Sequence, residues 1–141
     1  MMSCTFLVIG AIINGISLTI KSQFLCKFLE QNLILLLVAL LAVNTTTISV
    51  ILTKMREIAD NNPTIDFGDT KKAMQQSSIE HLFLIGIAVF LQILKGSPVV
   101  CSSFQYTGFV LDSLIIAIFI FSIQIVYDTA QSVYVILDHG H

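Results

Sequence analysis

The strongest constraint on this chain is a long uncharged run, from Leu33 to Thr53, in which no Asp, Glu, Lys or Arg occurs. A helix of that length can cross a bilayer, because a helix rises about 1.5 Å per residue and the hydrocarbon core is roughly 30 Å thick. The second half of the run carries five hydrogen-bonding side chains: Asn44, Thr45, Thr46, Thr47 and Ser49. Facing lipid is costly for such groups, so we expect part of this patch to face protein, water or a ligand.

The composition of the whole chain also indicates a membrane protein. Of its 141 residues, 55% are hydrophobic and only 11% are charged, so a soluble domain of this size could not cover its apolar groups. The formal net charge of -2 gives no overall basic field, and bulk charge therefore does not indicate nucleic acid or anionic lipid as a partner. The three cysteines form no CxxC pair, and we interpret them as small apolar packing residues.

The pattern predicts an all-α fold, a single membrane domain with four transmembrane helices, of which the second, third and fourth extend beyond the bilayer. We expect the first span at 5–20, an interfacial amphipathic connector at 21–31, the second span at 32–59 and a cytoplasmic loop at 60–68. The third helix is expected at 69–95, with Asp69 or Thr70 as its N-cap, then a loop at 96–105 and the fourth helix at 106–137.

The third span is the least regular of the four, because its apolar part, Leu82 to Leu94, covers only roughly 20 Å. The crossing could begin at Ile79, with Glu80 and His81 reaching the headgroups. Alternatively, the bilayer could be locally thin, or Val99 and Val100 could complete the crossing beyond a break. We favour the first alternative.

The basic residues suggest an orientation. One group lies on the side of the termini and the central loop: Lys54, Arg56, Lys71 and Lys72. The opposite side has the smaller group: Lys21, Lys27 and Lys95. Because cytoplasmic loops of membrane proteins are enriched in Lys and Arg, we predict that both termini and the central loop are cytoplasmic.

No sequence pattern indicates catalysis. A nucleophilic Ser with a His partner, an HExxH motif and a P-loop are not visible, so we predict a protein that is not an enzyme and that needs neither a cofactor nor a metal. Glu80 and His81 could form a proton or metal site, although we expect an interfacial pair solvated by headgroups. Asp112 and Asp128 bracket the fourth span, and they are either functional intramembrane carboxylates or simple interface residues.

The second span presents one stripe that could line a pore. On a helical wheel the stripe is apolar, then polar, and it ends in Lys54 at the cytoplasmic mouth. Its predicted pore-lining residues are Leu37, Leu40, Asn44, Thr47 and Ile51. In a symmetric oligomer they would form a dry constriction followed by a polar ring. A helix-packing seam would show the same pattern, and Thr or Ser hydroxyls can bond to their own helix, so both interpretations stay open.

This layout, with a second span that runs into the Lys54-x-Arg56 segment and a short charged central loop, resembles compact four-span membrane effectors of anti-phage defence. Examples are the phage-exclusion membrane protein RexB and the HalA component of Hailong-type systems. The resemblance implies an oligomeric ion channel in the bacterial inner membrane. Such a channel would open on an infection-linked signal and depolarise the membrane. We expect a homo-oligomer, and we take a tetramer as the expected state.

The Hailong-type resemblance further implies a nucleotide or a short single-stranded DNA as the signal, made by a partner nucleotidyltransferase. The residues that could hold such an anion are Lys54, Arg56, Lys71 and Lys72. Acidic residues in the same segment balance these positive charges. The alternatives are a non-catalytic structural subunit of a larger membrane complex and a small transporter, although the first span lacks the Glu expected of a proton-coupled exporter.

Overall fold

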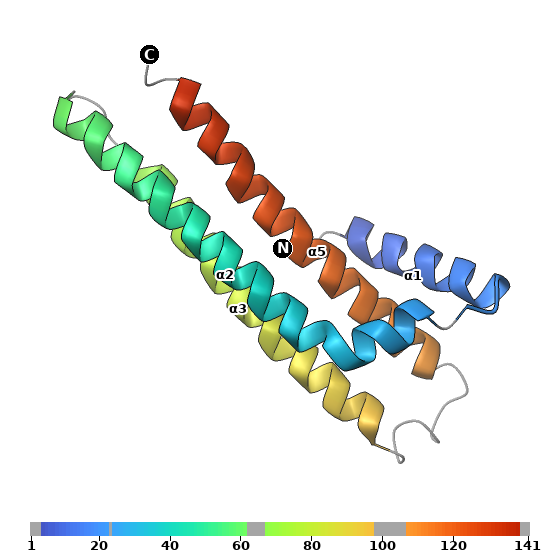
Figure 1. Cartoon of the computed structure of the whole chain (residues 1–141). Coiled ribbons are helices and arrows are strands. Elements are labelled where there is room, and N and C mark those ends of the chain that lie inside the picture. The colour runs from blue at the N-terminus through green and yellow to red at the C-terminus, as the bar shows by residue number, and fades with distance from the viewer. Residues whose placement is uncertain (1–3, 23, 62–66, 98–106, 139–141) are drawn as a thin grey trace.

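The computed structural model describes residues 4–22, 24–61, 67–97 and 107–138, and within these ranges the regular structure is helical (Figure 1). The helices are α1 (Cys4–Thr19), α2 (Phe24–Asn61), α3 (Gly68–Gly96) and α5 (Thr107–Asp138). Three of them, α2, α3 and α5, are long and apolar enough to cross a membrane, and α1 is a shorter apolar helix of 16 residues. The predicted all-α class is therefore confirmed.

Two helix boundaries differ from the prediction. α2 begins at Phe24, so most of the expected connector belongs to this helix, because Leu29 is fully buried in the same core as Leu33. α3 begins at Gly68, and neither Asp69 nor Thr70 caps it. Phe67 takes the N-cap position without a side-chain bond to the helix, and it packs on an apolar cluster of α2 and α3. Burial of aromatic and aliphatic groups therefore sets both starts, whereas charge and capping residues predict other positions.

α5 contacts all three other helices, and α2 and α3 lie side by side along much of their length (Figure 1). α2, α3 and α5 each present one stripe to a shared interior. The α3 stripe runs through residues 74, 77, 81, 84, 88 and 91, and the α5 stripe through 111, 115, 118, 122, 125 and 129. Steps alternating between three and four residues are the heptad spacing of packed helices. One end of this interior is an apolar core that includes Leu33, Leu37 and Leu84.

Cross-helix hydrogen bonds fix the register of the three long helices. Ser77 on α3 pairs with Thr129 on α5, and Lys95 pairs with Asp112, so α3 and α5 are antiparallel. At the level of Asp112 all three helices carry charge, and at the level of Asp128 α3 carries Glu80. Between these levels lies a band about 24 Å thick in which none of the three helices has an Asp, Glu, Lys or Arg.

This register shows that the uncharged run of α2 extends past the charge-free band. Asn44 pairs with Ser77, so it lies near the acidic end of the charge-free band. The threonine-rich half of the run, from Thr45 to Thr53, continues past Glu80 alongside the polar first half of α3. Only the first half of the run is therefore level with uncharged stretches on both neighbouring helices.

α1 packs antiparallel along α5. Asn14 donates hydrogen bonds to the Phe109 carbonyl (2.9 Å) and to the Ser113 hydroxyl (3.0 Å), and the rings of Phe6 and Phe121 lie 5.1 Å apart. The first turns of α1 are therefore level with Phe121, about two helical turns short of Asp128. Gly10 lies at the closest approach, where an added Cβ would be 2.5 Å from the Ser113 carbonyl oxygen.

Candidate functional site

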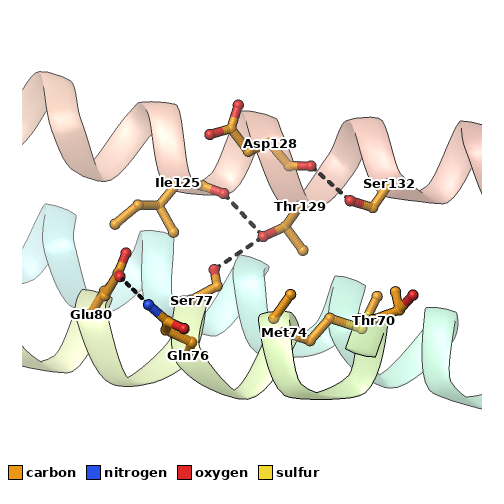
Figure 2. A pocket seen from close by; sticks show the side chains of 10 residues that line it. Thr70, Met74, Gln76, Ser77, Glu80, Ile125, Asp128, Thr129 and Ser132 are labelled. Atoms are coloured by element: carbon orange, nitrogen blue, oxygen red, sulfur yellow. Dashed lines mark hydrogen bonds between the residues drawn. The ribbon is translucent and has the colours of Figure 1, made fainter. Parts of the chain in front are cut away.

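A chain of buried and half-buried polar side chains links the three long helices. The Asn44 amide nitrogen lies 3.5 Å from the Ser77 hydroxyl, which lies 3.3 Å from the Thr129 hydroxyl. Thr129 donates its hydrogen to the Ile125 carbonyl at 3.0 Å (Figure 2). Because that hydrogen is used, Ser77 donates to Thr129 and accepts from Asn44. We name this donor chain of Asn44, Ser77 and Thr129 the polar seam.

Four buried polar atoms near the seam have no hydrogen-bond partner within the described part of the chain: Asn44 Oδ1, His81 Nδ1, His81 Nε2 and Ser122 Oγ. Asn44, His81 and Ser122 are all 0% exposed. His81 lies one helical turn from Ser77 and beside the backbone of Leu37 on α2. A buried unpaired polar group costs about 1–3 kcal/mol. These unpaired atoms therefore lower the stability of the packing in which they lie.

The polar seam reaches the surface through a groove between α3 and α5. The groove has a volume of about 390 Å³, and Figure 2 shows Ser77 and Thr129 facing each other across it. Glu80 and Asp128 line the same groove, and each carboxylate accepts a hydrogen bond from the glutamine four residues earlier, at 3.1 Å and 2.7 Å. Gln124 and Asp128 therefore pair on one face of α5. The groove thus joins two carboxylates to a buried hydroxyl pair.

The other end of the charge-free band is closed by an ion cluster. The Lys95 ammonium lies 2.6 Å from Asp112 on α5 and 3.4 Å from Glu30 on α2. The Gln92 amide also donates to the Glu30 backbone carbonyl, at 3.2 Å. Between this cluster and Ser122 the interior is apolar over about 15 Å, which is the rise of the ten residues from Asp112 to Ser122. A dry segment therefore separates the polar seam from the opposite charged end.

The predicted pore stripe of α2 faces the interior of its own chain. Leu37, Asn44 and Ile51 are buried against α3 and α5, and Leu40 and Thr47 are half-buried. The hydroxyls of the threonine-rich half each donate to the carbonyl four residues back, at 2.8–2.9 Å: Thr45, Thr46, Thr47, Ser49 and Thr53. Several copies of α2 could therefore form a ring with this stripe only if α3 and α5 moved away from it.

The structure brings together two of the four predicted anion-binding residues. Arg56 on α2 and Lys71 on α3 line a cavity of about 720 Å³ together with Phe67. Lys54 instead pairs with Glu57 at 2.6 Å, and Lys72 is exposed. A phosphate-bearing ligand in this cavity would meet Arg56 and Lys71 as its two cations.

The expectation that Glu80 and His81 form a headgroup-solvated pair is wrong for His81. Glu80 lines the groove, but His81 takes a core position in the α3 stripe, between Ser77 and Leu84. The sequence contained the signal, because Ser77, His81, Ser122 and Thr129 all fall on heptad positions otherwise occupied by apolar residues. Hydropathy alone does not reveal this pattern, because it does not identify the inward face of a helix.

Comparison of the chain with protein-family models, with curated proteins and with solved structures gave no match in any of the three. The resemblance to four-span anti-phage effectors therefore stays a prediction from the layout of the sequence. The polar seam, the groove and the charged ends are the features of this chain that bear on its function.

Proposed function

We propose that the protein conducts ions across a membrane and that the path runs inside one chain, along the polar seam between α2, α3 and α5. The observation that carries this proposal is the set of fully buried polar side chains, Asn44, His81 and Ser122, at core positions of apolar helices. Polar and ionisable groups facing the interior of a helix bundle commonly mark ion pathways. The acidic groove supplies an entrance on one side.

In this proposal the charge-free band lies in the hydrocarbon core. The ion cluster of Lys95, Asp112 and Glu30 would lie at one surface, and Glu80 and Asp128 at the other. The ends of α2, α3 and α5 beyond Glu80 would then project from the bilayer as a stem. α1, which packs on α5 from the opposite surface, would be a fourth span that covers most of the core.

The described packing corresponds to a closed state of the proposed path. Leu37 lies at the level of Ser122, and apolar side chains such as Leu33 fill the interior from there to the ion cluster. A dry apolar constriction of this kind blocks ions by excluding water. Opening requires water to enter between α2 and the α3–α5 pair. Four unpaired polar atoms favour that entry, because water would supply the hydrogen bonds that they lack.

A matched pair of leucine substitutions tests the proposed path. Leu37 is 0% exposed in the constriction, whereas Leu35 is 70% exposed on the outer face of the same helix. We expect Leu37→Asn to wet the constriction, to leak ions and to lower the membrane potential of cells that express it. Leu35→Asn adds the same amide to the outer face and should leave the potential unchanged. A silent Leu37→Asn chain that inserts normally, or an equal leak from both variants, would contradict the intrachain path.

The infection-linked role is a separate part of the proposal. We place the anionic signal in the cavity of Arg56 and Lys71, at the end of the stem, because two cations and Phe67 converge there. A non-catalytic subunit of a larger membrane complex is the second candidate. It is favoured by the large apolar side chains that α3 exposes on its outer face, among them Phe83 and Phe90, which could pack on a partner helix as well as on lipid.

A further inference from the structure

We infer that the permeant ion is the proton and that His81 transfers it; this inference rests on the proposed function. Between the two charged levels, α2, α3 and α5 contain no Asp, Glu, Lys or Arg, and His81 contributes the one imidazole. The ring is 0% exposed, neither nitrogen makes a hydrogen bond of good geometry within the described residues, and the Leu37 backbone of α2 lies close enough to interact with the ring. A buried imidazole with no strong hydrogen bond at either nitrogen is available to accept a proton at one nitrogen and release one from the other.

The tight packing around His81 favours a proton over a larger ion. The side chains of Asn44, His81 and Ser122 are fully buried, so no water-sized space touches them. A hydrated metal cation would need the three helices to separate by several ångströms. A proton needs only a continuous chain of donors and acceptors, which a small opening and a few water molecules can complete.

The hydrogen bonds define the proton path on the groove side of His81. From the groove, the hydroxyls of Ser77 and Thr129 lead toward Asn44, and His81 follows one turn further along α3. Ser122 lies at the level of Leu37, within about 5 Å of His81 along the bundle axis by the register of Ser77 with Thr129. The charged and titratable groups nearest to this path are Glu80 of α3 and Asp128 of α5. α2 contributes none between residues 31 and 44.

The transfer step balances with water as the only other reactant. A hydronium ion that enters from the groove gives its proton to the unprotonated nitrogen of His81, which forms a new N–H bond and leaves neutral water. The imidazolium then loses the proton from its other nitrogen to a water molecule on the Ser122 side, where an N–H bond breaks and hydronium forms. The ring is neutral again in its other tautomer, and rotation of the ring restores the starting state.

The experiment uses the full chain in proteoliposomes of neutral phospholipid, with proton flux and potassium flux measured separately. The Leu37→Asn chain, which wets the constriction, should pass protons much faster than potassium ions. Adding His81→Gln to it removes the titratable group but keeps a polar side chain, and should lower the proton flux about tenfold or more. As the matched control, Gln75→Ala alters an exposed polar side chain of α3 and should leave the flux unchanged.

The outcomes separate the inference from the proposed function. Proton flux that is undiminished in the His81→Gln chain overturns the role of His81. Potassium flux equal to proton flux in the Leu37→Asn chain overturns proton selectivity and leaves ion conduction standing, and this comparison holds even if His81→Gln fails to insert. Absence of both fluxes from a correctly inserted Leu37→Asn chain overturns the proposed function itself.

Discussion

At the residue scale, the same side chain has different roles on different faces of one helix. Asn32 and Asn44 both lie on α2, but the Asn32 amide donates to the Phe28 carbonyl of its own helix, at 3.0 Å. Asn44 is fully buried, reaches across to Ser77 on α3 and leaves its carbonyl oxygen unpaired. The threonines repeat this contrast: Thr45 bonds only to its own helix, whereas Thr129 joins α5 to α3. Burial and the partner, and not the residue type, decide which polar groups belong to the site.

The two asparagines give a prediction about conduction. In the Leu37→Asn background, Asn44→Leu should replace the polar side chain that α2 contributes beside Ser77 by an apolar one, interrupt the path between the groove and His81, and abolish the leak. Stability should change by less than about 1 kcal/mol, because the substitution removes an unpaired buried group together with one long hydrogen bond. Asn32→Leu should leave both properties unchanged. Flux in proteoliposomes and thermal unfolding in detergent measure the two effects, and a leak that persists in Asn44→Leu would exclude Asn44 from the path.

At the element scale, the helices could be predicted but their inward faces could not. Hydropathy indicated each helix, because long uncharged stretches have few alternatives in lipid. These helices are apolar on nearly every side, so a polar–apolar contrast does not distinguish the face that packs from the face that meets lipid. The heptad positions of Ser77, His81 and Ser122 distinguish it only once the neighbouring helix is known. For the same reason the sequence predicts a span over the whole uncharged run of α2, although Glu80 and Asp128 lie level with the middle of that run.

The contact of α1 with α5 gives a prediction about stability. A Cβ at Gly10 would lie 2.5 Å from the Ser113 carbonyl and 3.1 Å from Ala117, both on α5, whereas a Cβ at Gly15 has nothing within 4 Å. Gly10→Ala should therefore push α1 away from α5 and lower the free energy of unfolding by about 1–3 kcal/mol. Gly15→Ala should leave it unchanged or raise it by up to about 1 kcal/mol, through helix propensity. Thermal unfolding of both variants in the same detergent makes the comparison, and equal melting temperatures would mean that α1 does not pack on α5 in this way.

The end of the stem gives a prediction about the anionic signal. Lys71 lines the cavity with Arg56, whereas the neighbouring Lys72 is exposed and does not line it. Lys71→Glu should weaken binding of a short single-stranded oligonucleotide about tenfold or more, since a charge-assisted hydrogen bond is worth about 1.5–3 kcal/mol. Lys72→Glu changes the net charge equally and should have a smaller effect at physiological salt. Equal losses in both variants, measured by fluorescence anisotropy, would indicate non-specific attraction and no site.

At the scale of the whole molecule, α5 holds the fold together, because α1, α2 and α3 all pack on it. The sequence predicted the order of the helices and their approximate ends, but it did not predict the ion cluster, in which Lys95 reaches Glu30 and Asp112 on two other helices. These three residues are far apart in the chain, so only the packed bundle brings them together. The expected homo-oligomer, orientation and inner-membrane location depend on groups outside a single chain, and they remain predictions.

The thickness of the charge-free band has a consequence for the lipid that surrounds this protein. The band of about 24 Å is thinner than a typical hydrocarbon core of roughly 30 Å, so a bilayer centred on the band, as proposed above, would be in hydrophobic mismatch with the protein. The lipids would then have to compress at its perimeter, or the helices would have to expose the charged ends of the band to acyl chains. Either adjustment acts on Lys95 at one end and on the Glu80–Asp128 groove at the other. Lipids with short acyl chains would relieve this stress, and the balance between the dry and hydrated interior would then depend on the membrane in which the chain is embedded.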